Sequence, residues 1–179
     1  ILHEVGYVRT GAGAYHPAVE LKNVGTATED MGGKLVALAN QHSYEFPLGT
    51  PDTLVAPGEI LVVHLGVSGQ DGPLEFYSGA GTFRDLRAMD SVSFHAAQPA
   101  TDPTLLIDFV QWGAAGGALE GAAVTAGVWA AGSFVDSADR MPRGSLASFD
   151  EGTGAGRWYV DNTGTLGEEN AASPFVPVT

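Results

Sequence analysis

Five histidines are the first residues of this chain to suggest chemistry, because imidazole binds metals and carries protons near neutral pH. No two of them have the spacing of a ligand pair on one element, and the chain has no cysteine to complete a metal site. His64 lies within an apolar run, where a hydrogen-bonded structural histidine is usual. The alternative is a cluster assembled only by folding. The five are His3, His16, His42, His64 and His95.

One short stretch approaches the nucleophile elbow of serine hydrolases. Gly66–Gly69 reads G-V-S-G, but the last glycine of the G-x-S-x-G pattern is missing and no helix is expected after Ser68. Two other glycine-rich loops, Gly11–Gly13 and Gly152–Gly156, do not lie between a strand and a substantial helix, as a phosphate-binding loop must. Turn formation explains all three, so we assign no catalytic or cofactor-binding residue.

Acidic loops provide the best candidate ligands for a metal ion. Calcium takes about six to eight oxygen ligands, many of them carboxylates and loop carbonyls. No EF-hand spacing is present, so calcium binding is a hypothesis that rests on carboxylate density alone, and no metal ligand is assigned. The candidate donors are Asp136 with Asp139, Asp161 with Asn162, and Glu168 with Glu169.

Charge and composition limit the class of protein and its partners. The formal net charge is −13, and Lys22 and Lys34 are the only lysines, so nucleic acid and anionic lipid are poor partners. The 25 glycines and 10 prolines, with only 16% charged residues, favour short strands joined by turns. No apolar run reaches the length of a transmembrane helix. We expect a single, mostly β domain over residues 1–179.

The elements that must position these residues are centred on Tyr44–Val63. An aromatic strand, Tyr44–Phe46, leads through a turn at Pro57 and Gly58 into a buried aliphatic strand, Ile60–Val63. In Ala18–Asn23, the alternation predicts Val19 and Leu21 on one face and Glu20 and Lys22 on the other. The further expected strands are Ile1–Tyr7, Ala18–Asn23, Lys34–Ala39, Ser91–His95, Leu105–Trp112, Ser145–Phe149 and Arg157–Val160.

Two long segments are expected as insertions on this framework. The first spans residues 66–89, and Thr82 is predicted to cap a short helix that runs to Met89. The second spans residues 113–132, where four glycines would weaken a helix, so we expect a long surface connection. The end of the chain, Ser173–Thr179, carries two prolines and is expected to be extended.

The order of motifs resembles the bacterial lamin-tail domain family. Its opening strand is matched by His3-Glu4-Val5, and its second strand by Val19–Asn23. The fullest match is Tyr44–Pro47 followed by Leu54–Val63, which is similar to the family's aromatic-x-Phe-Pro and Leu-x-Pro-Gly-Glu motifs before an aliphatic strand. The later matches are Asp90-Ser91-Val92, Ile107–Gly113, Gly144-Ser145-Leu146, Trp158 and Thr165–Asn170.

This resemblance implies an all-β, immunoglobulin-like β-sandwich with two long loop insertions. It transfers no catalytic residue to this chain, because the family has none in common. Trp112 and Trp158 fall in strands that match the family's core, so both are expected to be buried. Trp129, with Phe134 nearby, is expected to be the exposed aromatic and a contact for a partner.

The function we expect is that of a non-enzymatic, extracellular or cell-surface interaction or structural module. Such a module would contact a protein partner or assemble with copies of itself, with Ser173–Thr179 adding as a strand to an open sheet edge. The start at Ile1 fits removal of a signal peptide, and trimming explains it equally well. The alternative is a secreted hydrolase with a loop-built, calcium-dependent site, which a pocket lined by histidine, serine and carboxylates would favour.

Overall fold

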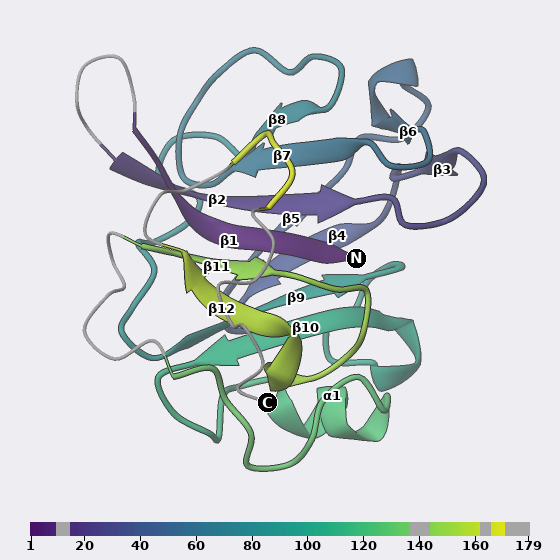
Figure 1. The fold of residues 1–179 in the computed structure, drawn as a ribbon. Coiled ribbons are helices and arrows are strands. Elements are labelled where there is room, and N and C mark those ends of the chain that lie inside the picture. The colour runs from purple at the N-terminus through teal and green to yellow at the C-terminus, as the bar shows by residue number, and fades with distance from the viewer. Residues whose placement is uncertain (10–14, 137–143, 162–165, 171–179) are drawn as a thin grey trace.

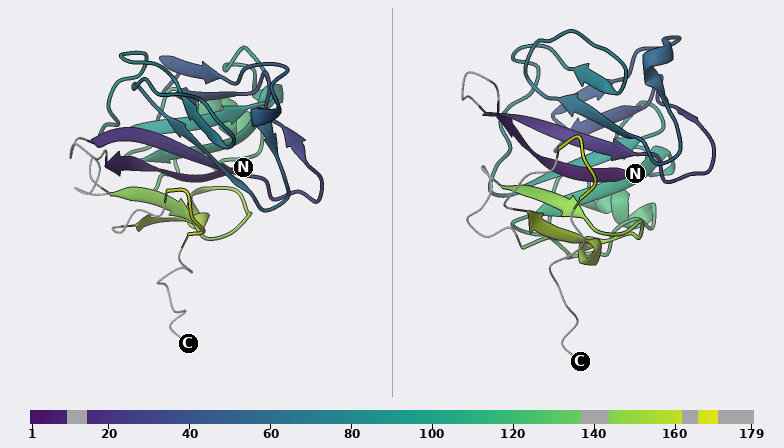
Figure 2. Two further views of the ribbon diagram at one scale, coloured as in Figure 1. Left: turned by 90° about the horizontal axis from the view of Figure 1, so that it is seen from above. Right: turned by 45° about the horizontal axis from the view of Figure 1, so that its top comes forward.

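The protein is mostly β and is built from two packed sheets with a small third sheet at one end (Figure 1). The computed structural model shows the two large sheets as separate layers when the molecule is turned (Figure 2). The fold is thus an all-β sandwich; composition predicted a mostly β protein, and the family resemblance implied the sandwich. The structure describes residues 1–9, 15–136, 144–161 and 166–170.

The larger sheet has six strands in the order β12-β11-β1-β2-β7-β8. Its pairs are antiparallel except for β7 and β8, which run parallel. The chain therefore crosses over between these two strands through the loop that follows His64. The strands are β1 (Leu2–Arg9), β2 (Tyr15–Lys22), β7 (Ile60–His64), β8 (Glu75–Tyr77), β11 (Ser145–Ser148) and β12 (Trp158–Asp161).

The second sheet has four antiparallel strands in the order β10-β9-β4-β5. These are β4 (Leu35–Leu38), β5 (His42–Glu45), β9 (Asp90–His95) and β10 (Leu106–Trp112). The small sheet pairs β3 (Glu29–Asp30) with β6 (Leu54–Val55). The helical segments are α1 (Glu120–Thr125) and three short 3-10 turns, Pro51–Thr53, Pro103–Leu105 and Ala155–Arg157.

An aromatic cluster joins the two layers around the stretch expected to organise the fold. Phe46, directly after β5, meets Phe76 of β8 edge to face, with ring centroids 5.4 Å apart. Leu61 and Val63 of β7 are fully buried, as expected for an aliphatic strand in the core. Residues 44–63 therefore contribute strands to both large sheets, and their side chains meet in the core between them.

A buried ion pair ties the sheets together on the side of β10 and β12. The Arg157 guanidinium donates to Asp108 Oδ2 over 2.6 Å, and both side chains are almost fully buried. The same carboxylate oxygen accepts the Leu2 backbone N–H at 2.8 Å, and Arg157 also donates to the Gly152 carbonyl at 2.6 Å. One carboxylate thus joins β10 to the first strand and to the turn that leads into β12.

The structure contradicts the helix predicted over Thr82–Met89. The Thr82 hydroxyl donates back to the carbonyls of Ser78 and Gly79 instead of capping a helix. The following residues are held as loop, because the Asp90 carboxylate binds the Arg84 guanidinium at 2.5 and 2.8 Å and accepts the Arg87 backbone N–H. These contacts fix a loop conformation that side-chain spacing alone does not reveal.

The segment 113–132 also differs from expectation. It contains the short helix α1, whose Ala123 is fully buried. The helix ends just before Gly127, which has a positive φ of 77°. Trp129, expected to be exposed, is only 5% exposed. Its ring packs edge to face on Phe109 and its indole N–H donates to the Ser133 carbonyl. The burial of Trp112 and Trp158 is as predicted.

Removing the carboxylate of the buried ion pair should destabilise the protein strongly. We expect Asp108→Ala to lower the free energy of unfolding by about 3–5 kcal/mol, because it leaves the Arg157 charge buried and uncompensated. The measurement is urea unfolding followed by tryptophan fluorescence.

The matched control is Asp85→Ala, which removes a carboxylate from an exposed residue. It should change the free energy of unfolding by no more than about 0.5 kcal/mol. Similar losses in the two variants would contradict the role of the ion pair.

Candidate functional site

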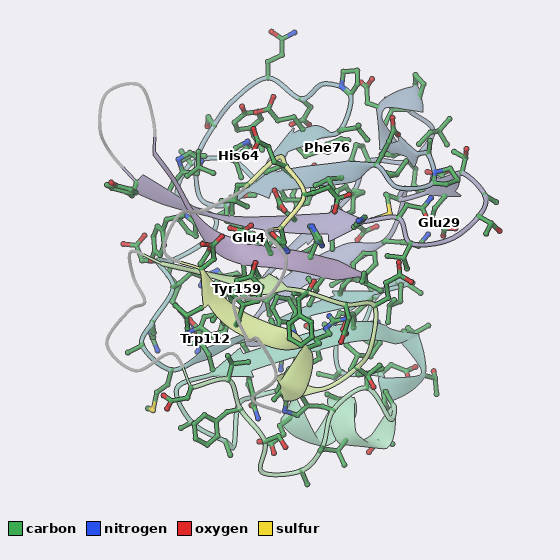
Figure 3. All side chains as sticks on the ribbon, in the orientation of Figure 1. Glu4, Glu29, His64, Phe76, Trp112 and Tyr159 are labelled. Atoms are coloured by element: carbon green, nitrogen blue, oxygen red, sulfur yellow. The ribbon has the colours of Figure 1, made fainter. Side chains whose placement is uncertain are left out.

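The outer face of the six-stranded sheet carries two carboxylates that are withdrawn from water. Glu4 of β1 lies directly opposite Glu20 of β2, and both are fully buried (Figure 3). The alternation predicted Glu20 on the face opposite Val19 and Leu21, but it did not indicate that this face is covered. The segment Leu166–Asn170 covers it: the Gly167 N–H donates to Glu20 Oε1, and Asn170 donates to the His3 and Ser148 carbonyls.

This environment changes the proton affinity of Glu20. Burial raises the pKa of Glu20 to about 8, since the charged form loses its hydration. The hydrogen bond from Gly167 opposes that rise, and the negative charges of Glu4 and Glu169 add to it. Glu20 Oε2 has no hydrogen-bond partner among the described residues. Glu20 therefore keeps its proton at neutral pH, which avoids two adjacent buried charges.

A chain of hydrogen bonds crosses the other end of the same face. His16 Nε2 lies 2.9 Å from His64 Nδ1, and His64 Nε2 lies 2.9 Å from Glu75 Oε1 (Figure 3 labels His64). Tyr77 donates to the same Glu75 oxygen and its ring stacks on His64 at 4.5 Å. Burial, with the neighbouring His64, lowers the pKa of His16.

The position of these hydrogen bonds indicates a structural role. His64 ends β7 while Glu75 and Tyr77 lie on β8, so the bonds fasten the parallel pair at the end of its crossover. Gly69 in that crossover has no room for a side chain, because a Cβ there would lie 2.3 Å from the Tyr77 ring. These contacts agree with the structural role that the sequence suggested for His64.

A polar pocket of about 150 Å³ lies beside the covering segment. Burial, followed by the charge of Lys22, lowers the pKa of His3 to about 4, so this imidazole is neutral at neutral pH. Glu169 pairs with Lys22 at 2.7 Å and lies 4.0 Å from His3 Nε2. The pocket thus combines a weak base with several carboxylates. Its polar lining residues are His3, Lys22, Ser148, Asp150, Glu151, Glu169 and Asn170.

The edge strand β5 presents unpaired backbone groups. The Phe46 N–H donates to the Lys34 carbonyl, so by the antiparallel alternation Tyr44 and His42 also bond to β4. The N–H and C=O of Ser43 and Glu45 then point away from β4. No strand in the described part of the chain pairs with that side, and both side chains are exposed.

Two other sheet edges are closed by neighbouring loops. On β8, the Asp71 carboxylate accepts the Tyr77 N–H, and Gly72 exchanges backbone hydrogen bonds with Glu75. On β10, the Val135 N–H donates to the Gln111 carbonyl and its carbonyl accepts the Gly113 N–H. Among the residues that the structure describes, none covers the free side of β5 in this way.

A hollow of about 200 Å³ lies alongside β5 on the outer face of the four-stranded sheet. It is lined by Ala37 of β4, by residues 40–43 and by the loop 98–101. Of these residues, Ala37 and Ala100 pack in a small apolar cluster with Leu35. A strand added to β5 would therefore have a ready recess for one of its side chains.

The other candidate residues are scattered. His95 is fully buried and bonds Ser93, and burial lowers its pKa to about 4. His42 packs near Phe83, and the Ser68 hydroxyl accepts the Ala80 N–H. Phe134, beside the buried Trp129, is 41% exposed.

The calcium candidates do not form a site that the structure displays. Asp139 and Asn162 lie outside the described residues, whereas Asp136 and Asp161 lie within them. Of the last pair, Glu169 forms an ion pair with Lys22, and Glu168 is exposed. Within the described part of the chain, no group of three histidine or acidic side chains is placed to hold a metal ion.

No family model, no curated protein and no solved structure matches the chain. The described residues contain no helix that is both long and apolar enough to cross a membrane. Function must therefore be argued from the surfaces of this molecule alone.

The raised pKa of Glu20 should make stability depend on pH. Because the folded state holds this proton up to about pH 8 and the unfolded state only to about 4.5, the contribution is complete below pH 4.5 and is lost as pH rises to 8. We expect this loss to reach as much as about 4 kcal/mol, and Glu20→Gln to remove it.

The comparison is urea unfolding of the protein and of Glu20→Gln between pH 4.5 and 9. Glu168→Gln, at an exposed residue, is the control and should follow the unsubstituted protein. A stability difference between the protein and Glu20→Gln that does not change with pH would refute the buried, protonated carboxyl.

Proposed function

We propose that this chain is a non-enzymatic interaction module of the lamin-tail kind, acting outside the cell or at its surface. The order of motifs supports that kinship, and the all-β sandwich agrees with it. The immunoglobulin-like topology is part of the same proposal. The net charge of −13 argues against nucleic acid and anionic lipid as partners.

The observation that carries the proposal is the free side of β5. An edge strand with unpaired N–H and C=O groups is a template for another strand, and main-chain bonds give such complexes their affinity. Ser43 and Glu45 offer these groups, and the hollow at Ala37 and Ser43 would take alternate side chains of the added strand. Because the β10 edge is closed, β5 is the open edge of the four-stranded sheet among the described residues.

The partner we propose is an extended protein segment, either from another protein or from a second copy of this chain. Ser173–Thr179, expected to be extended, is the candidate within the chain and lies outside the described residues. Its prolines lack N–H groups, so the carbonyls of that segment, which would accept the outward N–H groups of Ser43 and Glu45, would carry much of the pairing.

A secreted hydrolase is the second candidate, and the polar pocket beside Glu169 favours it. That pocket combines His3, Ser148 and carboxylates, the residue types that such a site needs. Hydrolysis of fluorogenic ester and glycoside substrates, with and without calcium, tests it. Activity that His3→Gln abolishes would replace the binding proposal, whereas no turnover by the folded protein would remove this candidate.

Blocking the free side of β5 should abolish strand addition without breaking the sheet. We expect Ser43→Pro to weaken binding at least tenfold, because proline removes an outward N–H while the bonds of His42 and Tyr44 to β4 remain. The probes are a labelled peptide of residues 173–179, followed by fluorescence anisotropy, and self-association, followed by light scattering.

Ser43→Ala keeps the outward N–H and is the matched control, expected to bind within about twofold of the unsubstituted protein. Circular dichroism and urea unfolding establish that both variants fold. Equal binding by the two variants, or no peptide binding and no self-association at millimolar concentration, would overturn the assignment of β5.

A further inference from the structure

An apolar hollow opens at one end of the sandwich. It has a volume of about 280 Å³ and lies where β2, β9 and β10 meet the small β3–β6 sheet. Leu21 and Phe94 line it from the two large sheets, and Val55 and Met31 from the small sheet and its neighbouring turn. All four side chains belong to the buried core, so the hollow is an extension of the core that reaches the surface.

Two positively charged side chains line this pocket, although the protein as a whole is strongly acidic. Lys22 and Lys34 both line it, and they are the only lysines in a chain of net charge −13. Lysine side chains run their aliphatic stems along apolar surface and keep the ammonium in water. Here both side chains are mostly buried, at 20% and 17% exposure, so the stems belong to the pocket wall.

The present partners of these lysines are exchangeable. Lys34 pairs with Glu29 at 2.6 Å and Lys22 with Glu169 at 2.7 Å, and both glutamates are more than half exposed (Figure 3 labels Glu29). Ion pairs to carboxylates that are this exposed contribute little to stability, and Lys34 also donates to the Asp30 carbonyl at 2.5 Å, a bond that does not involve Glu29. An anion that also buries apolar surface in the pocket can therefore displace either carboxylate at small cost.

We propose that this pocket binds a small amphipathic carboxylate, with its hydrocarbon part against Leu21, Phe94 and Met31 and its carboxylate beside Lys34 and Lys22. An apolar cavity of about 150 Å³ accommodates benzene, so 280 Å³ suits a ligand of roughly ten non-hydrogen atoms. Octanoate has that size and charge. This site shares no lining residue with the hollow beside β5.

The two described methionines provide an internal test. Met31 lines the pocket and is 5% exposed, whereas Met89 is 63% exposed and lies elsewhere. Titration of the protein, labelled with carbon-13 at its methionine methyl groups, with octanoate should shift the Met31 signal saturably and leave Met89 unchanged. Octanol, which has the same chain without the charge, should bind at least fivefold more weakly.

Charge variants separate the apolar and anionic parts of the proposal. Lys34→Gln should weaken octanoate binding about five- to tenfold and leave octanol binding unchanged. Arg87→Gln removes the same charge from an exposed residue outside the pocket and should have no effect. Thermal unfolding checks that both variants fold.

Three results would overturn the proposal. One is a Met31 signal that does not move below the micelle concentration of octanoate, and another is an equal movement of Met31 and Met89. The third is equal affinity for octanol and octanoate with no effect of Lys34→Gln, which would leave an apolar hollow without an anion site.

Discussion

The constraint on which the rest of the structure depends is the burial of Asp108 against Arg157. Two charges removed from water cost several kcal/mol each, and only close contact and full hydrogen bonding offset that cost. Asp108 meets this requirement by binding Arg157 and the Leu2 N–H, so the first strand, β10 and the turn before β12 must all be in place together. The pair fixes how the two sheets lie against each other, which in turn places every surface described above.

The two sheets use their outer faces differently. On the six-stranded sheet, the segment Leu166–Asn170 covers Glu20, and the His16–His64–Glu75 chain fastens β8. These polar groups are therefore occupied in holding the fold. On the four-stranded sheet, β5 keeps one side free beside a hollow. We propose the sheet edge at β5 as the contact surface, and we expect the buried ionisable groups to make stability depend on pH.

Local pattern was enough to find most strands of the two large sheets, because apolar alternation and turn residues are properties of neighbouring positions, but it missed β8 within the expected insertion 66–89. It failed where distant segments decide the outcome. The burial of Glu20 could not be read from its strand, since its cover comes from Gly167, 147 residues away. Trp129 looked exposed because nothing in an alanine- and glycine-rich stretch predicts its packing on Phe109. The meeting of His16 with His64, and the free side of β5, depend in the same way on strand order, which the sequence does not state.

Amide hydrogen exchange along β5 tests the central claim most directly. In the free protein, the N–H groups of Ser43 and Glu45 should exchange fast, and those of His42 and Tyr44, bonded to β4, should be protected. Bound to a partner segment, or at concentrations where copies associate, Ser43 and Glu45 should become protected as well. If their exchange stays fast in a fully formed complex, or is already slow in the dilute monomer, β5 is not the strand that the partner extends.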